Sequence, residues 1–158
     1  MLSRSTASSR AIPVARRIQA IKDNPVLPVE WGMNEKGMQA RTLADDHTAE
    51  RAEGAWLDAM NHAIEQAKVL IELGIHKQIA NRLLEPFCHV STVITATEWS
   101  NFFALRCHPD AQPEFRELAL AMADAYRASI PKHLEWGEWH LPFITDEEYY
   151  CSARDDED

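Results

Sequence analysis

The first thirteen residues of the chain combine small hydroxylated residues with arginines and contain no acidic residue. Hydroxyls, backbone N–H groups and guanidinium forks are the groups with which proteins hold anions, most often phosphates. Ser8, Ser9 and Arg10 end this run shortly before Pro13. Neither serine has a nearby histidine and aspartate in the order of a hydrolase triad. We therefore interpret both hydroxyls as ligand-binding groups rather than nucleophiles.

Two further arginines lie at the edges of apolar segments. Arg82 interrupts the apolar turn at residues 79–84, and Arg106 follows the Phe-Phe-Ala-Leu of residues 102–105. A single arginine of this kind is more often a snorkelling surface residue or one half of an ion pair. Together with the Ser/Arg run, they favour an anionic ligand. Asn101 is an amide inside an apolar run and needs hydrogen-bond partners if it is buried.

A zinc site is the alternative use of two Cys-His pairs, Cys88-His89 and Cys107-His108. Paired zinc ligands are usually separated by two to four residues, and adjacent side chains point apart in a strand. The spacing therefore favours buried cysteines with structural histidines, and we predict no metal. The sequence also contains no glycine-rich phosphate loop and no nucleophile elbow.

Composition indicates one soluble domain. The chain has 158 residues, 46% of them hydrophobic and 26% charged, which is enough to bury a core. The net charge of −9 argues against nucleic acid as a partner, because phosphate contacts need a basic surface. We expect a single domain over residues 1–145 and an acidic, disordered tail over residues 146–158. Three scattered cysteines, no membrane-length apolar stretch and no export leader favour the cytoplasm.

Hydrophobic spacing predicts a helix-rich α/β (α+β) chain with little strand. The expected helices are Val14–Asp23, Asp45–Leu73, His76–Leu84, Trp99–Arg106 and Pro113–Ser129. Asp45 is expected to cap the second helix and Gly74 to follow it in a left-handed conformation. Val90–Thr97 is β-branched and is the one good strand candidate. A single strand cannot form a sheet, so we expect its partners in another subunit or in a missing segment.

The same spacing predicts which faces are buried. In the first helix it places Ala15, Ile18 and Ile21 on the apolar side and Arg16, Arg17 and Lys22 on the other. The expected buried stripe of the long helix consists of Trp56, Met60, Ala63, Ala67, Leu70 and Ile71. In the third helix, Ile79 and Leu83 share one face. The expected buried stripe of the last helix consists of Phe115, Leu118, Ala119, Met122, Ala125 and Tyr126. Residues 25–39 are expected to form a packed loop, and Trp136, Trp139 and Phe143 to pack on the remainder.

Three segments of the chain, Ala80–Pro86, Thr95–Arg106 and Asp110–Arg116, resemble the C-terminal half of flavin-dependent thymidylate synthases, the thymidylate synthase complementing proteins. The most specific element is Asn-Phe-x-x-Leu-Arg, followed six residues after the Arg by Gln and an amphipathic helix. Ser3, Ser8 and Arg10 match the last three fixed positions of the family signature, Arg-His-Arg-x-x-Ser-x-x-x-x-Ser-x-Arg. The loops at residues 28–32 and 36–39 resemble the phage-type branch, and the resemblance extends over residues 1–129.

The resemblance implies an enzyme that methylates dUMP to dTMP. FAD reduced by NADPH would supply the hydride and methylenetetrahydrofolate the carbon, in a homotetramer with a mixed α/β fold and active sites shared between subunits. No protein nucleophile is implied, and membranes are not partners. The signature's leading Arg-His-Arg would lie before Met1, so the resemblance implies an N-terminally truncated member. The alternative is a non-catalytic nucleotide-binding protein or an inactive family member, and a hydroxymethylated product is a further possibility.

The resemblance also implies roles for individual residues. Ser8 and Arg10, with the backbone around Ser9, would hold the phosphate and ribose of dUMP, and Arg82 would also hold dUMP. Arg106 would face the uracil and favour its N3-ionised form by fixed positive charge, which is the catalytic role. The implied FAD contacts are Asn101 and Thr97.

Overall fold

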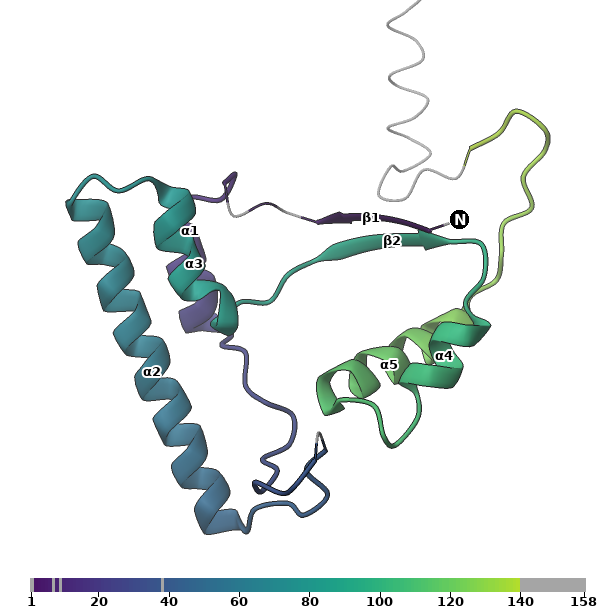
Figure 1. The fold of residues 1–158 in the computed structure, drawn as a ribbon. Coiled ribbons are helices and arrows are strands. Elements are labelled where there is room, and N and C mark those ends of the chain that lie inside the picture. Colours follow the sequence, from purple (N-terminus) through teal and green to yellow (C-terminus); the bar gives the residue numbers. More distant parts are fainter. Residues whose placement is uncertain (1, 7, 9, 38, 140–158) are drawn as a thin grey trace, which may run out of the picture. The chain divides into compact units, whose positions relative to one another are not determined.

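A computed structural model of the chain describes residues 2–6, 8, 10–37 and 39–139. The elements in chain order are β1 (Leu2–Thr6), α1 (Val14–Asp23), α2 (Asp46–Glu72), α3 (Lys77–Leu84), the 3₁₀ helix η1 (Glu85–Phe87), β2 (Thr92–Ala96), α4 (Ser100–Arg106) and α5 (Pro113–Ala128) (Figure 1). The chain divides into two compact units, residues 1–124 and residues 125–158. The helix-rich composition is compatible with the predicted α+β class. Within the described residues, no helix combines the length and apolar character needed to cross a bilayer.

The predicted helices are present, and none of their ends differs from the prediction by more than one residue. The start of α2 is capped as expected, because the Asp45 carboxylate accepts a hydrogen bond of 2.8 Å from the Thr48 backbone N–H. At the other end of α2, Gly74 has a φ of 77°, in the left-handed region that favours glycine. The helix between these two signals is therefore fixed by local sequence.

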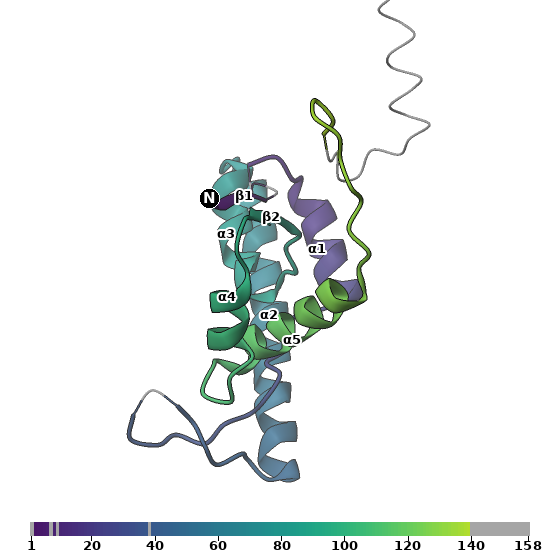
Figure 2. The ribbon, with the colours of Figure 1, turned by 90° about the vertical axis from the view of Figure 1, so that its right-hand side faces the viewer.

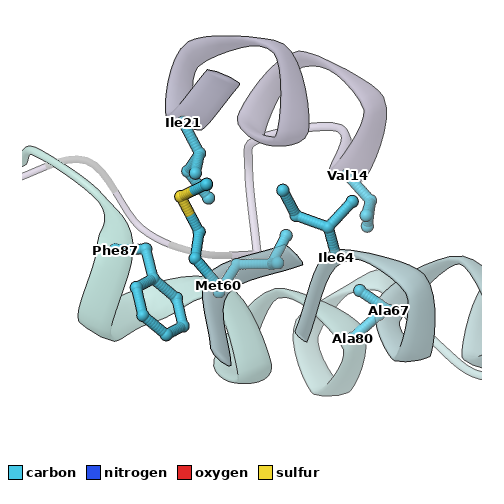
Figure 3. Close-up of a cluster of buried hydrophobic side chains, with 8 residues drawn as sticks. Val14, Ile21, Met60, Ile64, Ala67, Ala80 and Phe87 are labelled. Carbon is cyan, nitrogen blue, oxygen red and sulfur yellow. The ribbon is translucent and has the colours of Figure 1, made fainter. Parts of the chain in front are cut away.

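The core lies where α1, α2, α3 and η1 meet. Figures 1 and 2 both show α3 lying beside α2. The buried apolar side chains of this core are Val14, Ile21, Met60, Ile64, Ala67, Ala80, Leu84 and Phe87. In Figure 3, Met60 and Ile64 of α2 point toward Ile21 and Val14 of α1. These contacts remove apolar surface from water, which is the main free-energy gain of packing α1 and α3 against α2.

The loop between α1 and α2 is attached to this core, as its aromatic content predicted. Trp56 donates a hydrogen bond of 2.9 Å from Nε1 to the Val26 carbonyl oxygen. Its ring also meets Trp31 and Phe87 edge to face, with centroid distances of 6.3 and 5.5 Å. A single indole therefore joins the loop, α2 and η1.

The predicted face of α1 is correct in part, and that of α3 is wrong. In α1, Ile21 is buried and Ile18 packs against the core as predicted, but Arg17 is buried and Ala15 is exposed. In α3 the predicted pair Ile79 and Leu83 lies on the exposed face, and the buried residues are Ala80, Asn81 and Leu84. Both helices are short and mixed in composition, so one step around the helix axis exchanges a polar for an apolar face.

Further apolar residues that we expected to be buried are exposed. Ile71, the last residue of the predicted α2 stripe, is 42% exposed. In α5 the buried residues are Ala119 and Ala123, whereas Phe115, Leu118 and Tyr126 are at least half exposed. Within residues 125–139, Trp136 and Trp139 are also exposed, which corrects the prediction that they pack; Phe143 lies outside the described residues. Hydrophobic periodicity identifies an apolar face, but it does not determine whether the same chain covers that face.

The strand partner is in the chain itself, which corrects the expectation that it lies elsewhere. β1 pairs with β2 in antiparallel register, from Leu2 opposite Ala96 to Thr6 opposite Thr92. The Thr6 hydroxyl adds a hydrogen bond of 3.1 Å to the Ser91 carbonyl oxygen. The Ser/Arg composition of β1 has no alternating apolar pattern, and the pair is defined by its backbone hydrogen bonds.

Candidate functional site

The Ser/Arg segment after β1 forms a tight turn. The Arg10 backbone N–H donates a hydrogen bond of 3.2 Å to the Ser8 hydroxyl oxygen, and the Ala11 N–H donates one of 3.0 Å to the Ser8 carbonyl oxygen. This pattern is typical of serine in turns and orients the hydroxyl against its own backbone. The Arg10 side chain is exposed and free to meet a ligand from solvent. Ser9 lies outside the described residues.

A buried amide connects this segment to the helix that carries Arg82. Asn81 of α3 is fully buried and donates a hydrogen bond of 2.9 Å from Nδ2 to the Ile12 carbonyl oxygen. The next residue in α3, Arg82, is exposed in the last turn of that helix. The hydrogen bond between Asn81 and Ile12, which are 69 residues apart in sequence, therefore links the segment that follows the Ser8–Arg10 turn to the helix that carries Arg82.

The remaining predicted residues belong to the opposite end of the strand pair. Ser8 follows β1 at the end where Thr6 pairs with Thr92, whereas Thr97 follows β2 at the end where Ala96 pairs with Leu2. Because a strand advances about 3.4 Å per residue, these two ends are roughly 14 Å apart. Thr97, Asn101 and Arg106 all follow β2 in the chain, and we treat them as a second group.

Arg106 ends α4 beside a hollow of about 330 Å³. The lining residues are Ala104, Leu105, Arg106, His108, Asp110 and Ala111. The guanidinium carbon of Arg106 lies 5.7 Å from the centroid of the Phe115 ring. A guanidinium over an aromatic face is attracted by the ring quadrupole, which restricts its motion while leaving its N–H groups available. Periodicity had assigned Phe115 to the core, so sequence reasoning missed this contact.

The turn after α4 is held by several hydrogen bonds. The Asp110 backbone N–H donates a hydrogen bond of 3.2 Å to His108 Nδ1. Arg116 donates from Nη1 to the Pro109 carbonyl oxygen at 3.2 Å and also forms an ion pair with Glu30. These contacts fix the loop that lines the Arg106 hollow against the loop before α2.

The proposed flavin residues are accessible. Asn101 is exposed on α4, and Thr97 is exposed immediately after β2. The start of α4 is oriented by Glu98, whose carboxylate accepts a hydrogen bond of 2.7 Å from the Ser100 backbone N–H. The hydrogen bonds from Ser100 lower the pKa of the Glu98 carboxyl group, so this cap is ionised at neutral pH.

Metal ligation has no geometric basis in the part of the chain that the structure describes. Among those residues no three histidine, cysteine or acidic side chains gather in one place where they could hold an ion. Cys88 is half-buried and its thiol donates to the Leu84 carbonyl oxygen at 3.1 Å. Burial raises the pKa of the Cys88 thiol, which makes it a poor thiolate ligand.

Comparison with known protein families identifies the chain. The family model for the thymidylate synthase complementing protein matches residues 18–132, which is more than half of the chain. The chain belongs to this family. Its function class is therefore thymidylate synthesis, and the resemblance found in the sequence is confirmed at family level. The match contains Arg82, Thr97, Asn101 and Arg106, and Ser8–Arg10 precede it. Neither a search of curated proteins nor a search of solved structures gave a match.

Proposed function

We propose that this chain is a flavin-dependent thymidylate synthase subunit that converts dUMP to dTMP with methylenetetrahydrofolate and NADPH-reduced FAD. The observation that carries the proposal is the family match, which includes the Asn-Phe-x-x-Leu-Arg pattern. The last residue of that pattern, the exposed Arg106, lines a hollow. Because all these reactants are water-soluble metabolites, the cytoplasm is the expected compartment.

The nucleotide phosphate would be held by the group of residues around the Ser8 turn. Arg10 and Arg82 are both exposed and both permanently charged, which suits a phosphate dianion. The Ser8 hydroxyl oxygen already accepts from the Arg10 N–H, so its own proton is available for donation to a phosphate oxygen. Ser9 is proposed to contribute through its backbone.

Arg106 is proposed as the catalytic residue that faces the uracil. A guanidinium keeps its charge throughout the physiological pH range, so it would stabilise negative charge on a pyrimidine that has lost its N3 proton. The Phe115 ring restricts the guanidinium before the substrate arrives, so less conformational entropy is lost on binding. No side chain of this chain has to attack the base.

The residues after β2 fit a flavin in their chemistry. Asn101 offers both an amide donor and an amide acceptor on an exposed helix face, as the polar edge of an isoalloxazine ring or a ribityl chain requires. Thr97 offers a hydroxyl nearby in sequence. When bound, reduced FAD would supply the hydride for the methyl group, and the protein's part is to orient the ring against the pyrimidine.

A site shared between subunits follows from the two separated groups. The Ser8–Arg10–Arg82 group and the Thr97–Asn101–Arg106 group lie at opposite ends of the β1–β2 ladder. One dUMP molecule has to contact both groups, so the first group of one subunit would meet the second group of another. We infer a homotetramer with active sites between subunits, as the family resemblance implies.

The test is a flavin absorbance spectrum of the purified chain mixed with FAD, followed by a dUMP titration. The expected result is a flavin band that is shifted from free FAD and changes further with dUMP. Arg106→Ala should weaken the dUMP response about 10- to 100-fold, because a charge-assisted hydrogen bond contributes about 1.5–3 kcal/mol. Arg106→Lys should recover part of it.

Arg51→Ala is the matched control, because Arg51 is an exposed arginine of α2 outside both groups. It should leave the titration unchanged. A spectrum identical to free FAD that dUMP does not alter would reject the proposal. A dUMP-dependent rise in melting temperature without any flavin response would favour a non-catalytic nucleotide-binding protein instead.

A further inference from the structure

A second hollow lies beside the helical core, and none of the residues assigned to dUMP or FAD lines it. Its volume is about 500 Å³, within the range of roughly 300–1,000 Å³ of small-molecule sites. It is lined by Ile12, Arg16, Arg17, Ala20, Ile21, Asn24, Cys88 and His89. One wall is apolar, and the polar groups include two adjacent arginines of α1. Among the described residues, no acidic side chain lines it.

Arg17 is the unusual member of this lining. It is only 7% exposed, and among the described residues no carboxylate lies within ion-pair distance of its guanidinium and no oxygen accepts a hydrogen bond from it. Burying an unpaired charge is costly. Most buried groups escape this cost by losing their charge, but a guanidinium does not release its proton in proteins. The structure therefore holds a permanent positive charge that lacks a counter-charge within the described chain.

The neighbouring groups in the hollow add donors of the same kind. Arg16 is exposed at its rim and offers a second guanidinium fork, and His89 offers an imidazole N–H. The first 22 residues of the chain carry five basic and no acidic side chains, so the local field is positive although the whole chain has a net charge of −9. Two adjacent forks and an imidazole match the acceptor oxygens of an oxyanion.

We propose that this hollow is a binding site for a small oxyanion, a phosphate or carboxylate group, held by Arg17 and Arg16 with His89 at its edge. The apolar wall of Ile12, Ala20 and Ile21 would accommodate the carbon skeleton of an organic anion. The site is separate from the proposed dUMP contacts, because Arg10 and Arg82 do not line it. Its occupation would neutralise Arg17 and so stabilise the packing of α1 on the core.

Cys88 provides a reporter, because its half-buried thiol lines the same hollow. The experiment measures the rate at which neutral iodoacetamide alkylates Cys88 in the full chain, read by peptide mass spectrometry, with inorganic phosphate or with chloride at equal ionic strength. At ten times the dissociation constant about one site in eleven is free, so Cys88 should react about tenfold more slowly. Cys107 does not line this hollow and is the internal control.

Variants test whether the protection of Cys88 by phosphate depends on Arg17. Arg17→Met keeps an unbranched apolar stem and should abolish protection of Cys88, and its melting midpoint in chloride should equal or exceed that of the parent chain because an uncompensated charge is removed. Arg17→Lys should retain a weaker effect. If Arg17→Met does not fold, Arg16→Ala at an exposed position should still reduce protection several-fold.

Protection that persists in Arg17→Met and Arg16→Ala would overturn the proposal. Protection lost in Arg10→Ala and Arg82→Ala but kept in Arg17→Met would also overturn it, because phosphate would then act through the proposed nucleotide site. A third outcome would also overturn the proposal: phosphate does not protect Cys88 in the parent chain, and Arg17→Met changes the oligomeric state. Arg17 would then pair with a carboxylate of a second copy of the chain rather than with a free oxyanion. A failed flavin titration would not affect these results, since they do not depend on FAD or dUMP.

Discussion

Arg17 and Asn81 are the polar side chains that the described core buries, and they have opposite consequences. Asn81 reaches across 69 residues of sequence to the Ile12 carbonyl oxygen, so its amide orders the segment that leads to Arg10. Arg17 brings a charge into the same core without a counter-charge among the described residues. The first residue positions the proposed nucleotide site, and the second creates the proposed anion site.

The Asp45 cap at the start of α2 predicts how the stability of the chain depends on pH. Hydrogen bonding to Thr48 lowers the pKa of the Asp45 carboxyl group in the folded state. The stability that this carboxylate contributes is therefore fully present above its unfolded pKa of about 3.9 and is lost as the pH falls through the lowered folded value. Asp45→Ala should lower the melting midpoint at pH 7, and the difference from the parent chain should narrow below about pH 4.

Thermal melts followed by circular dichroism between pH 7 and pH 3 measure this difference. Asp45→Asn keeps a capping oxygen that does not titrate, so its midpoint should depend less on pH in this range than that of the parent chain. A difference between the parent chain and Asp45→Ala that stays constant across the range would show that the charge at Asp45 has no part in the cap.

At the scale of elements, α2 is the scaffold on which α1, α3 and the loop before it are assembled. It carries the largest share of the core, with Met60, Ile64 and Ala67 buried along one side. The exposed apolar residues of α5 show the contrasting case of a helix whose periodic face is not covered by the described chain. The inferred contacts between subunits offer such a face a partner.

Two glycines of this region predict opposite responses to the same substitution. Gly74 has a φ of 77°, so Gly74→Ala should destabilise the chain by about 1 kcal/mol through left-handed strain. Gly54 lies at an exposed position of α2, and a Cβ there would meet nothing within 4 Å. Gly54→Ala should therefore stabilise the chain by about 0.5–1 kcal/mol.

Urea unfolding of the two variants and the parent chain measures both effects. Each variant serves as the control for the other, because the chemical change is identical and the backbone conformation differs. Equal shifts of the same sign would contradict the assignment of a left-handed C-terminal end to α2.

At the scale of the whole molecule, the arrangement of the two residue groups predicts complementation between subunits. Arg10→Ala and Arg106→Ala chains should each lose the dUMP-dependent flavin response. When the two variants are mixed and reassembled, about one site in four should combine an intact Arg10 from one subunit with an intact Arg106 from another, if sites lie between subunits of a symmetric oligomer. The recovered response should therefore reach roughly a quarter of that of the parent chain.

The same mixing experiment has an outcome that would contradict sites shared between subunits. If each site is built within one chain, every site in the mixture lacks one arginine and no response returns. A mixture of Arg10→Ala and Arg82→Ala is the matched control, because both residues belong to the same group and their combination should restore nothing.

Local sequence determined the helices of this protein. Asp45 and Gly74 place the ends of α2, and Pro113 starts α5, because capping, left-handed backbone and proline geometry act within a few residues. The pattern around Arg106 also determined the family, because Asn101 and Arg106 are spaced along a single helix. These features need no knowledge of the rest of the chain.

Only the tertiary structure decided which faces are buried and which strands pair. Arg17 lies inside and Ile79 outside because α1 and α3 rotate to pack against α2, and periodicity in a short helix does not resolve a rotation of one residue. The β1–β2 pair joins residues about 90 positions apart through backbone groups that every residue possesses, so side-chain pattern contains little information about it. That pairing separates Ser8 from Thr97, and this distance rather than any motif divides the candidate site into two halves.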